Sequence, residues 1–298
     1  MQLRQALNAA VERFTSANVP SSRMNAELLI MFMLDCDRAY LYAHPERELT
    51  ADEMHRYDEA LARRSNGEPA QYITGHQEFW GMDFIVSPAV LIPRPETEHV
   101  IEAVLELVSA GAGAKQSQDQ EQRTGVSAPH NLRIVDVGTG SGAIALALAK
   151  ELSTAEIHAT DISPAALEVA RANTARLELT SRVEFHLADL LSGFSPASFD
   201  FIVSNPPYVG ESEEDSVQLE VRKFEPRNAV FAGPTGLEVV ERLIPQAHAA
   251  LVPGGWLVFE VSGTIADGVR NLLSGWNDVA IRNDLQGIAR VAMARKAL

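Results

Sequence analysis

Apolar positions from Leu132 to the C-terminus fall into short runs that are separated by segments with helical spacing. The runs predict seven strands, at residues 132–137, 156–161, 182–188, 199–204, 256–261, 278–283 and 290–296. Helices are predicted between them, at residues 142–152, 164–177, 236–251 and 264–274. This alternation predicts a mostly parallel α/β sheet with helices on both faces. Only the turn 284–289 joins the last two strands, so we expect an antiparallel hairpin there, because parallel pairs need a long crossover.

The first 74 residues show a purely helical pattern. Apolar side chains recur at helical spacing from the start of the chain, at Leu3, Leu7, Val11 and Phe14. Thr50 and Glu53 have the spacing of a capping box, in which each side chain accepts a hydrogen bond from the other residue's backbone N–H. This signal predicts a helix that ends near Arg64. Residues 1–74 are therefore predicted to form a small, all-helical N-terminal domain.

Residues 75–94 change character and carry strand-forming side chains. Phe79 and Trp80 precede Gly81, and the run 84–86 follows it. We predict a β-hairpin that links the helical domain to the α/β domain.

The second domain is expected to span residues 95–298. Pro95 suits the first turn of a helix, which should continue to about Ser109. Residues 110–130 have no apolar periodicity and consist mainly of small, polar and charged residues, so they predict a flexible surface insertion.

Charge and cysteine content restrict the environment and the partners. The chain has 25 Lys and Arg against 40 Asp and Glu, a formal net charge of -15, which argues against a direct nucleic-acid partner. Cys36 is the only cysteine, so no disulfide can form within the chain, as is usual in a reducing cytoplasm. No apolar run reaches the ~20 residues that span a bilayer. We expect a soluble, cytoplasmic monomer with no membrane partner.

A glycine-rich loop follows the first predicted strand of the second domain, with the sequence Gly138-Thr139-Gly140-Ser141-Gly142. Glycines let a backbone turn sharply and approach a ligand closely, and free N–H groups at the next helix start would face that ligand. The loop predicts a nucleoside-containing cofactor. It does not by itself distinguish a methyl donor from a dinucleotide, because Gly138, Gly140 and Ala143 also fit the dinucleotide pattern.

Three acidic residues lie at the predicted strand ends. Asp136 precedes the glycine loop and is expected to organise it. Asp161 ends the second strand, where a carboxylate can accept hydrogen bonds from both ribose hydroxyls, each worth about 1.5–3 kcal/mol. Asp189 ends the third strand and could accept a hydrogen bond from an adenine amino group, although such a residue can equally be a turn former.

The fourth predicted strand leads into Asn205-Pro206-Pro207-Tyr208, which favours methyl transfer over hydride transfer. Two prolines remove two backbone donors, so carbonyl groups there can point into a pocket. The Asn205 oxygen and the Pro206 carbonyl could together hold an NH₂ group, while Tyr208 covers its flat face. Acceptors placed for a pyramidal nitrogen would favour the transition state over the planar ground state. We therefore predict S-adenosylmethionine as cofactor and a planar amide or amine nitrogen as acceptor.

The eight histidines are scattered, and no His or Cys pair has the spacing along the chain of metal ligands. On this ground no metal site is expected.

Beyond these motifs, nearly the whole chain except 110–130 resembles the PrmC/HemK family, which methylates the glutamine of the Gly-Gly-Gln motif in peptide chain release factors. Three further stretches carry the resemblance: Glu68-Pro69-Ala70-Gln71-Tyr72-Ile73-Thr74-Gly75 with Phe79 and Gly81; Leu91-Ile92-Pro93-Arg94-Pro95-Glu96-Thr97-Glu98; and Glu225-Pro226-Arg227-Asn228-Ala229 with Gly233 and Gly236-Leu237.

The resemblance implies a Rossmann-like class I methyltransferase domain behind a helical domain that docks the release factor. Matched by position, Gly138 to Gly142, Asp161, Asp189 and Leu190 would bind the cofactor, with Asn205 beside it. Asn205 to Tyr208 would hold the substrate glutamine, with Asn205, Pro206 and Tyr208 acting in catalysis. Leu190 stands where many members have tryptophan, and Ser262 to Ile265 replace the family's usual Gly-x-x-Gln after Glu260.

Three alternatives remain beside this interpretation. An adenine amino methyltransferase acting on DNA or RNA shares the Asn-Pro-Pro-Tyr motif but needs a basic groove, which this acidic chain does not suggest. A dinucleotide oxidoreductase shares the glycine loop but leaves the acceptor motif unexplained. A non-catalytic binding module would not need either motif to be complete.

Overall fold

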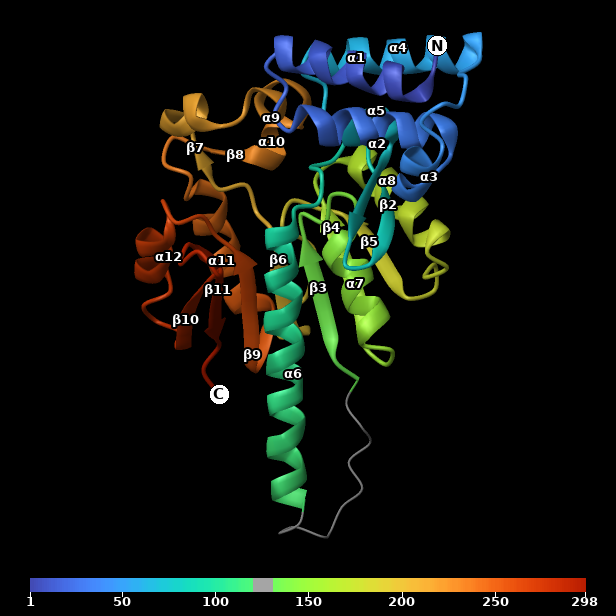
Figure 1. The fold of residues 1–298 in the computed structure, drawn as a ribbon. Helices are drawn as coiled ribbons and strands as arrows, with labels where there is room; N and C mark the ends of the chain where they lie inside the picture. The colour runs from blue at the N-terminus through green and yellow to red at the C-terminus, as the bar shows by residue number, and fades with distance from the viewer. Residues whose placement is uncertain (120–130) are drawn as a thin grey trace. The chain divides into compact units, whose positions relative to one another are not determined.

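The computed structural model describes residues 1–119 and 131–298, which pack as two compact units (Figure 1). One unit, here the helical unit, comprises Met1–His76 and Val217–Phe224. The other, called the methyltransferase unit after the family that its sequence resembles, comprises Gln77–Ser216 and Glu225–Leu298. The chain therefore passes between the two units three times.

The helical unit contains the helices that the first 74 residues predict. They are α1 (Leu3–Ser16), α2 (Ser22–Leu34), α3 (Arg38–Ala43), α4 (Ala51–Ser65) and α5 (Ala70–Thr74). The apolar positions of α1, α2 and α4 face one another and bury Phe14, Leu29 and Tyr57. Thr50 and Glu53 form the predicted capping box at the start of α4.

A segment distant in sequence completes this unit. Helix α9 (Leu219–Phe224) belongs to it, although the sequence pattern assigned these residues to the second domain. The side chain of Arg64 is buried and pairs with Glu220 at 2.7 Å. It also donates to the Asn25 side chain and to the Glu68 carbonyl. A buried guanidinium needs this full set of acceptors, so α9 is an integral part of the helical unit.

The predicted hairpin consists of β1 (His76–Phe79) and β2 (Met82–Ile85). Trp80 and Gly81 both have positive φ, as a two-residue hairpin turn requires. The rings of Phe79 and Phe84 are fully buried in the core of the methyltransferase unit and meet edge to face at 6.0 Å. The hairpin thus contributes to that core and is more than a linker.

The methyltransferase unit is built on the predicted seven-stranded sheet. Its strands are β3 (Arg133–Val137), β4 (Glu156–Asp161), β5 (Val183–Leu187), β6 (Phe199–Ser204), β9 (Leu251–Glu260), β10 (Asn277–Asn283) and β11 (Ala289–Arg295). They lie in the order β10-β11-β9-β6-β3-β4-β5. Strand β11 is antiparallel to both neighbours, so the predicted C-terminal hairpin is confirmed. Strand β9 begins at Leu251, earlier than predicted, with a register irregularity opposite Phe199/Phe201.

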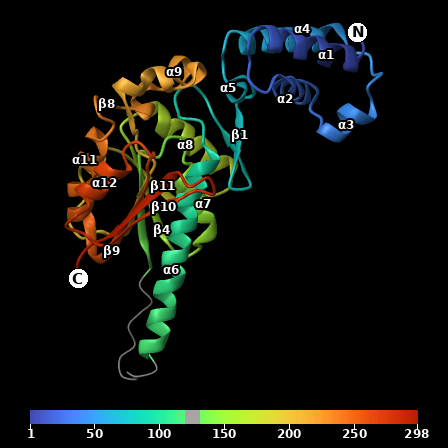
Figure 2. The same cartoon turned by 60° about the vertical axis from the view of Figure 1, so that its left-hand side comes forward.

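Helices cover both faces of this sheet, as predicted (Figure 2). Helices α6 (Glu98–Asp119), α7 (Ala143–Glu151) and α8 (Pro164–Arg176) cover one face, and α11 (Glu238–Ala250) and α12 (Ala266–Leu272) cover the other. Helix α6 extends to Asp119, so the prediction of an unstructured insertion is wrong for 110–119. The remainder of that prediction, 120–130, lies outside the described residues.

Short elements that the sequence pattern did not predict follow the acceptor motif. Strand β7 (Val209–Gly210) pairs in parallel with β8 (Phe231–Gly233), and α10 (Arg227–Val230) precedes β8. A 3-10 helix at Glu211–Ser216 leads away towards α9. A separate 3-10 turn, Pro95–Thr97, precedes α6. Within the described part of the chain, no helix is both long and apolar enough to cross a membrane.

Candidate functional site

A cavity of about 330 Å³ opens in the methyltransferase unit. It lies at the carboxyl ends of β3, β4 and β6, where β3 is hydrogen-bonded to β4 on one side and to β6 on the other. Ligands bind at this point in open α/β sheets because the loops diverge there and leave a crevice. The predicted site residues on its wall are Gly138, Thr139, Gly140, Ser141, Asp161, Asp189, Leu190, Asn205 and Pro207.

The glycine loop has the open backbone that the sequence predicts. Gly138 and Gly140 have φ of 71° and 55°, and a β-carbon on either would meet nothing within 4 Å, so the space beside them is open to a ligand. Gly142 differs, because its β-carbon would lie 3.2 Å from the Leu146 side chain and 3.4 Å from Ala170. Gly142 therefore allows α7 and α8 to pack closely and is not on the cavity wall.

Asp136 stands behind the loop and is buried. Its Oδ2 accepts hydrogen bonds from the Thr139 hydroxyl at 2.6 Å and from the Ala145 backbone N–H at 3.2 Å. Its Oδ1 is buried and has no hydrogen-bond partner among the described residues. Burial raises the pKa of Asp136 to about 7, against hydrogen bonds that lower it. An orphaned buried acceptor of this kind suits a donor on a ligand.

Asp161 lines the cavity at the end of β4. Its two carboxylate oxygens accept from the backbone N–H groups of Gly140 at 2.9 Å and Ser163 at 2.8 Å. Each oxygen keeps a further lone pair, so the carboxylate can still accept from a diol. Burial raises the pKa of Asp161. Ser163 caps α8 itself, which leaves Asp161 available to the cavity.

Asp189 and Leu190 lie together on the wall beyond Asp161. The Asp189 carboxylate pairs with Arg242, a residue of the cavity wall that the sequence motifs did not indicate. Leu190 has a φ of 54°, a left-handed conformation that is uncommon for a side chain of this kind. Its apolar side chain can contact one face of an aromatic ring.

The acceptor motif is held by a chain of buried and partly buried hydrogen bonds. Asn205 Nδ2 lies 3.0 Å from Thr97 Oγ1. The Thr97 hydroxyl lies 2.5 Å from Glu260 Oε2, and the Tyr208 hydroxyl lies 3.0 Å from Glu260 Oε1. Glu260 is almost fully buried at the end of β9, and burial raises its pKa. Burial, with the nearby Glu260, also raises the pKa of Tyr208.

The donors and acceptors in this chain fix the orientation of the asparagine amide. The hydroxyls of Thr97 and Tyr208 donate to the two carboxylate oxygens of Glu260. The Thr97 oxygen then accepts from Asn205, which assigns the amide NH₂ to that side. The Asn205 oxygen makes no hydrogen bond with the described residues, and Asn205 is one of the residues that line the cavity.

Asn205 and Pro207 line the cavity, but Pro206 and Tyr208 do not. Tyr208 is expected from the sequence to cover a bound group, but in the structure its hydroxyl is anchored to Glu260. Its backbone is crowded as well: a β-carbon on Gly236 would lie 2.5 Å from the Tyr208 carbonyl oxygen. The loop from Asn205 to Tyr208 is therefore packed firmly against the segment that precedes α11.

Two of the sequence stretches that carry the family resemblance meet at Glu225. This buried carboxylate accepts a hydrogen bond from the Ile92 backbone at 3.1 Å and pairs with Arg94. The contact places Pro93 and Thr97 from one stretch, and Pro226 and Asn228 from the other, on the same cavity wall.

Thr97 and Glu260 are functional candidates that the motifs alone did not assign. A signal for Glu260 exists in the sequence, because it is a charged residue that directly follows the apolar run 257–259. Thr97 offers no such signal, since its neighbours Glu96 and Glu98 are the more conspicuous residues.

Both parts of the chain are similar to known proteins. A family model described as the PrmC N-terminal domain matches residues 5–75, and another, described as the methyltransferase small domain, matches residues 124–223. A release factor glutamine methyltransferase from Koribacter versatilis is 54% identical over 99% of this chain and 99% of its own length. The chain belongs to the release factor glutamine methyltransferase family.

Other members of the release factor glutamine methyltransferase family are more distant. The protein from Moorella thermoacetica is 41% identical over 91% of this chain and 89% of its own. Among solved structures, the hMettl16 catalytic domain in complex with MAT2A 3'UTR hairpin 1 matches with a TM-score of 0.54 at 17% identity, covering 87% of this chain and 85% of that one. At this identity the likeness concerns the fold alone.

Proposed function

We propose that this chain transfers a methyl group from S-adenosylmethionine to the side-chain amide nitrogen of the glutamine in the Gly-Gly-Gln motif of peptide chain release factors. The observation that carries the proposal is the oriented Asn205 amide on the cavity wall, whose NH₂ is bonded to Thr97 and whose oxygen makes no hydrogen bond with the described residues. Family membership supports the same substrate, since the relatives are named for it.

The residues of the cavity fit S-adenosylmethionine. Asp161 has lone pairs left for ribose hydroxyls, and the open backbone at Gly138 and Gly140 leaves room for a ligand. The unpartnered oxygen of Asp136 provides an acceptor behind the loop, on the side where the methionine end would lie. Leu190 would contact the adenine ring, and Asp189 would accept from its amino group while it stays paired with Arg242. When bound, this cofactor supplies an electrophilic methyl group on a positively charged sulfur.

The chain's own contribution is to hold the glutamine amide. Asn205 Oδ1 would accept one hydrogen of the substrate NH₂. The carbonyl of the adjacent Pro206, a residue that does not line the cavity in the structure, would accept the other once the substrate is bound, which directs the nitrogen lone pair towards the methyl group. This arrangement favours the pyramidal nitrogen of the transition state. Alignment of the reacting atoms can lower the barrier by up to ~7–11 kcal/mol. A strong base is not required, because the proton can leave after the methyl group has been transferred.

The helical unit offers a surface for docking the release factor. Met24, Leu28 and Phe32 are exposed on α2 and follow one another at four-residue spacing, so they form one apolar stripe along the helix. Exposed apolar stripes of this kind mark sites of protein contact more often than isolated apolar residues do. We propose that this stripe contacts the protein substrate.

The test is methyl transfer from labelled S-adenosylmethionine to an unmodified release factor and, in parallel, to an adenine-containing duplex. We expect label on the Gly-Gly-Gln glutamine by peptide mass spectrometry, and none when that glutamine is changed to alanine. Asn205→Ala should lose most transfer while cofactor binding changes far less. Label on the duplex alone would refute the proposed substrate, and equal loss of transfer and cofactor binding would refute the role of Asn205.

A further inference from the structure

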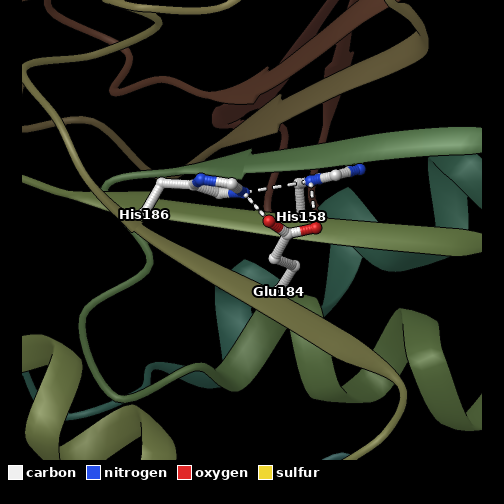
Figure 3. A group of neighbouring side chains, drawn as sticks. All are labelled: His158, Glu184 and His186. Atoms are coloured by element: carbon white, nitrogen blue, oxygen red, sulfur yellow. Dashed lines mark hydrogen bonds and ion pairs between the residues drawn. The ribbon is translucent and has the colours of Figure 1, made fainter.

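Three side chains that the methyl-transfer site does not use converge on the sheet of the methyltransferase unit. His158 on β4 lies opposite Glu184 on the parallel strand β5, and His186 follows two residues after Glu184. Because side chains alternate along a strand, Glu184 and His186 share the face of the sheet on which His158 lies. Figure 3 shows the two imidazoles and the carboxylate turned towards one another. The expectation of no metal site considered spacing along the chain alone, and strand register brings these residues together.

The distances between these side chains are close to those between ligands of one metal ion. His158 Nδ1 and His186 Nε2 are 3.1 Å apart. Two nitrogens bound to one tetrahedral zinc at about 2.0–2.1 Å would be about 3.3 Å apart. Glu184 oxygens lie 3.7 Å from His158 Nδ1 and 3.5 Å from His186 Nε2. The Glu184 side chain is 67% exposed, so a small rotation can bring it to bonding distance.

A second carboxylate orients the more deeply buried imidazole. Glu156 Oε1 lies 2.9 Å from His158 Nε2 and accepts the proton of that nitrogen. In the neutral imidazole Nδ1 then carries a lone pair that points towards His186 and Glu184. Protein ligands of zinc are held in this way, with a carboxylate on the far nitrogen that fixes the tautomer and raises the basicity of the ligand.

We propose that His158, Glu184 and His186 bind one divalent cation, with Zn²⁺ as the ion that two imidazoles and a carboxylate suit best. Solvent supplies the fourth position at the exposed side of Glu184. The site is separate from the cavity and does not depend on the proposed methyl transfer.

The surroundings favour a bound cation. The rings of Phe194 and Phe199 pack edge to face against His158, and Phe194 also packs against His186 at 4.9 Å. The two carboxylates, Glu156 and Glu184, together with Arg133 near Glu156, leave one net negative charge beside the imidazoles, which a divalent cation offsets.

The ion would join two strands that both lead to the cofactor cavity. Asp161 follows His158 by three residues, and Asp189 follows His186 by three residues. Strand β5 is the edge of the sheet, and in the described part of the chain it is hydrogen-bonded to β4 alone. A metal bridge between these strands would therefore hold the proposed ribose-binding and adenine-binding residues in register.

The experiment is a calorimetric titration of the full, tag-free, metal-free protein with ZnCl₂, paired with thermal unfolding. We expect one Zn²⁺ per chain and a rise in melting temperature of about 5–10 °C when free Zn²⁺ is about 100-fold above its dissociation constant. His186→Gln should abolish both effects. Glu156→Gln should weaken Zn²⁺ binding by about 10- to 100-fold, as expected for a group that orients a ligand.

His99→Gln is the matched control, because His99 also pairs with a glutamate, Glu102, but on helix α6. It should bind Zn²⁺ as the unchanged protein does. If His186→Gln lowers the melting temperature without metal, Glu184→Gln with Co²⁺ replaces it, and loss of the visible absorption of four-coordinate Co²⁺ is then expected. Equal Zn²⁺ affinity in His186→Gln and His99→Gln, no binding at millimolar Zn²⁺, or full Co²⁺ absorption in Glu184→Gln would overturn the proposal.

Discussion

The hydroxyl of Thr97 donates a 2.5 Å hydrogen bond to the buried carboxylate of Glu260, across 163 positions of the chain. The same oxygen receives the amide of Asn205 at 3.0 Å, so one hydroxyl connects the 3-10 turn before α6 with the acceptor loop after β6. The orientation of the proposed glutamine-binding oxygen therefore depends on a residue outside the acceptor motif.

Replacing Thr97 tests this dependence. Thr97→Val removes the hydroxyl, leaves a buried Glu260 oxygen without its partner and frees the Asn205 amide to rotate. We expect kcat to fall about 10²-fold, the size of effect produced by a 1 Å misplacement of a substrate. Thr97→Ser keeps the hydroxyl and should retain most activity. Steady-state kinetics with a release factor measures both variants, and a wild-type kcat in Thr97→Val would contradict the assignment.

Gly236 offers a test of the packing behind Tyr208. Both Gly236 and Gly287 have positive φ, 84° and 81°, but a β-carbon meets the Tyr208 carbonyl at 2.5 Å only at Gly236. Alanine at Gly287 should cost about 1–2 kcal/mol for its left-handed backbone alone. Alanine at Gly236 should cost more and also lower kcat, because the acceptor loop must shift. Thermal unfolding and kinetics of the two variants separate the cost of the left-handed backbone from that of the contact with the Tyr208 carbonyl. Identical stability and kcat in the two variants would exclude an effect of that contact.

Asp136 should give the stability of the methyltransferase unit an unusual pH dependence. Its pKa is raised from 3.8 to about 7, so between these values the folded chain holds a proton that the unfolded chain has released. The contribution of Asp136 to stability therefore falls as pH rises from about 4 to about 7, and is constant above that range. Asp136→Asn lacks this term. The free energy of unfolding of Asp136→Asn should therefore rise relative to that of the unchanged protein, by about 2–3 kcal/mol as the pH is raised from about 5 to about 8.

Urea unfolding without cofactor measures that gain. Asp284→Asn is a control of opposite sign, because hydrogen bonds from the Ile288 backbone and from Arg290 lower the pKa of Asp284. The contribution of Asp284 to stability is present above its ordinary pKa and is lost only as the pH falls through its lowered pKa in the folded protein. This contribution should therefore stay constant between about pH 5 and about pH 8. Parallel pH profiles for the unchanged protein and Asp136→Asn would show that Asp136 is not buried as described.

The apolar stripe on α2 can be tested by separating docking from chemistry. Leu28→Ser and Phe32→Ser should raise KM for an intact release factor about 5- to 10-fold each, since each removes part of a buried apolar contact. The kcat value, and KM for a short Gly-Gly-Gln peptide, should not change. Leu285, which is fully exposed in the turn between β10 and β11, provides the control substitution Leu285→Ser. An equal rise in KM for peptide and protein would argue against docking through α2.

Local signals made much of the fold and part of the site predictable. Alternation of apolar runs and helical spacing is a property of adjacent residues, so the seven strands and the C-terminal hairpin follow from it. The glycine loop, Asp161 and Asn205 lie at strand ends, and parallel strand ends converge on one edge. Their meeting at one cavity was therefore predictable.

Features that depend on contacts between residues distant in the sequence could not be predicted in this way. Thr97 and Glu260 meet through tertiary packing, and nothing near Thr97 indicates its partner. His158 and His186 come together through the register of β4 with β5, although they are 28 positions apart. The extension of α6 to Asp119 also contradicted composition, because small and polar residues continue a helix that has already begun.

The passage of residues 217–224 through the helical unit has a consequence for how such proteins can be rearranged. The helical unit is not one continuous N-terminal segment. Its helix α9 comes from residues that lie, in the sequence, between two parts of the methyltransferase unit, and Glu220 of α9 pairs with buried Arg64. Exchanging residues 1–76 between relatives would therefore separate Arg64 from the Glu220 with which it is matched. A functional chimaera should require two exchanged segments, and the two units are expected to diverge together rather than as independent modules.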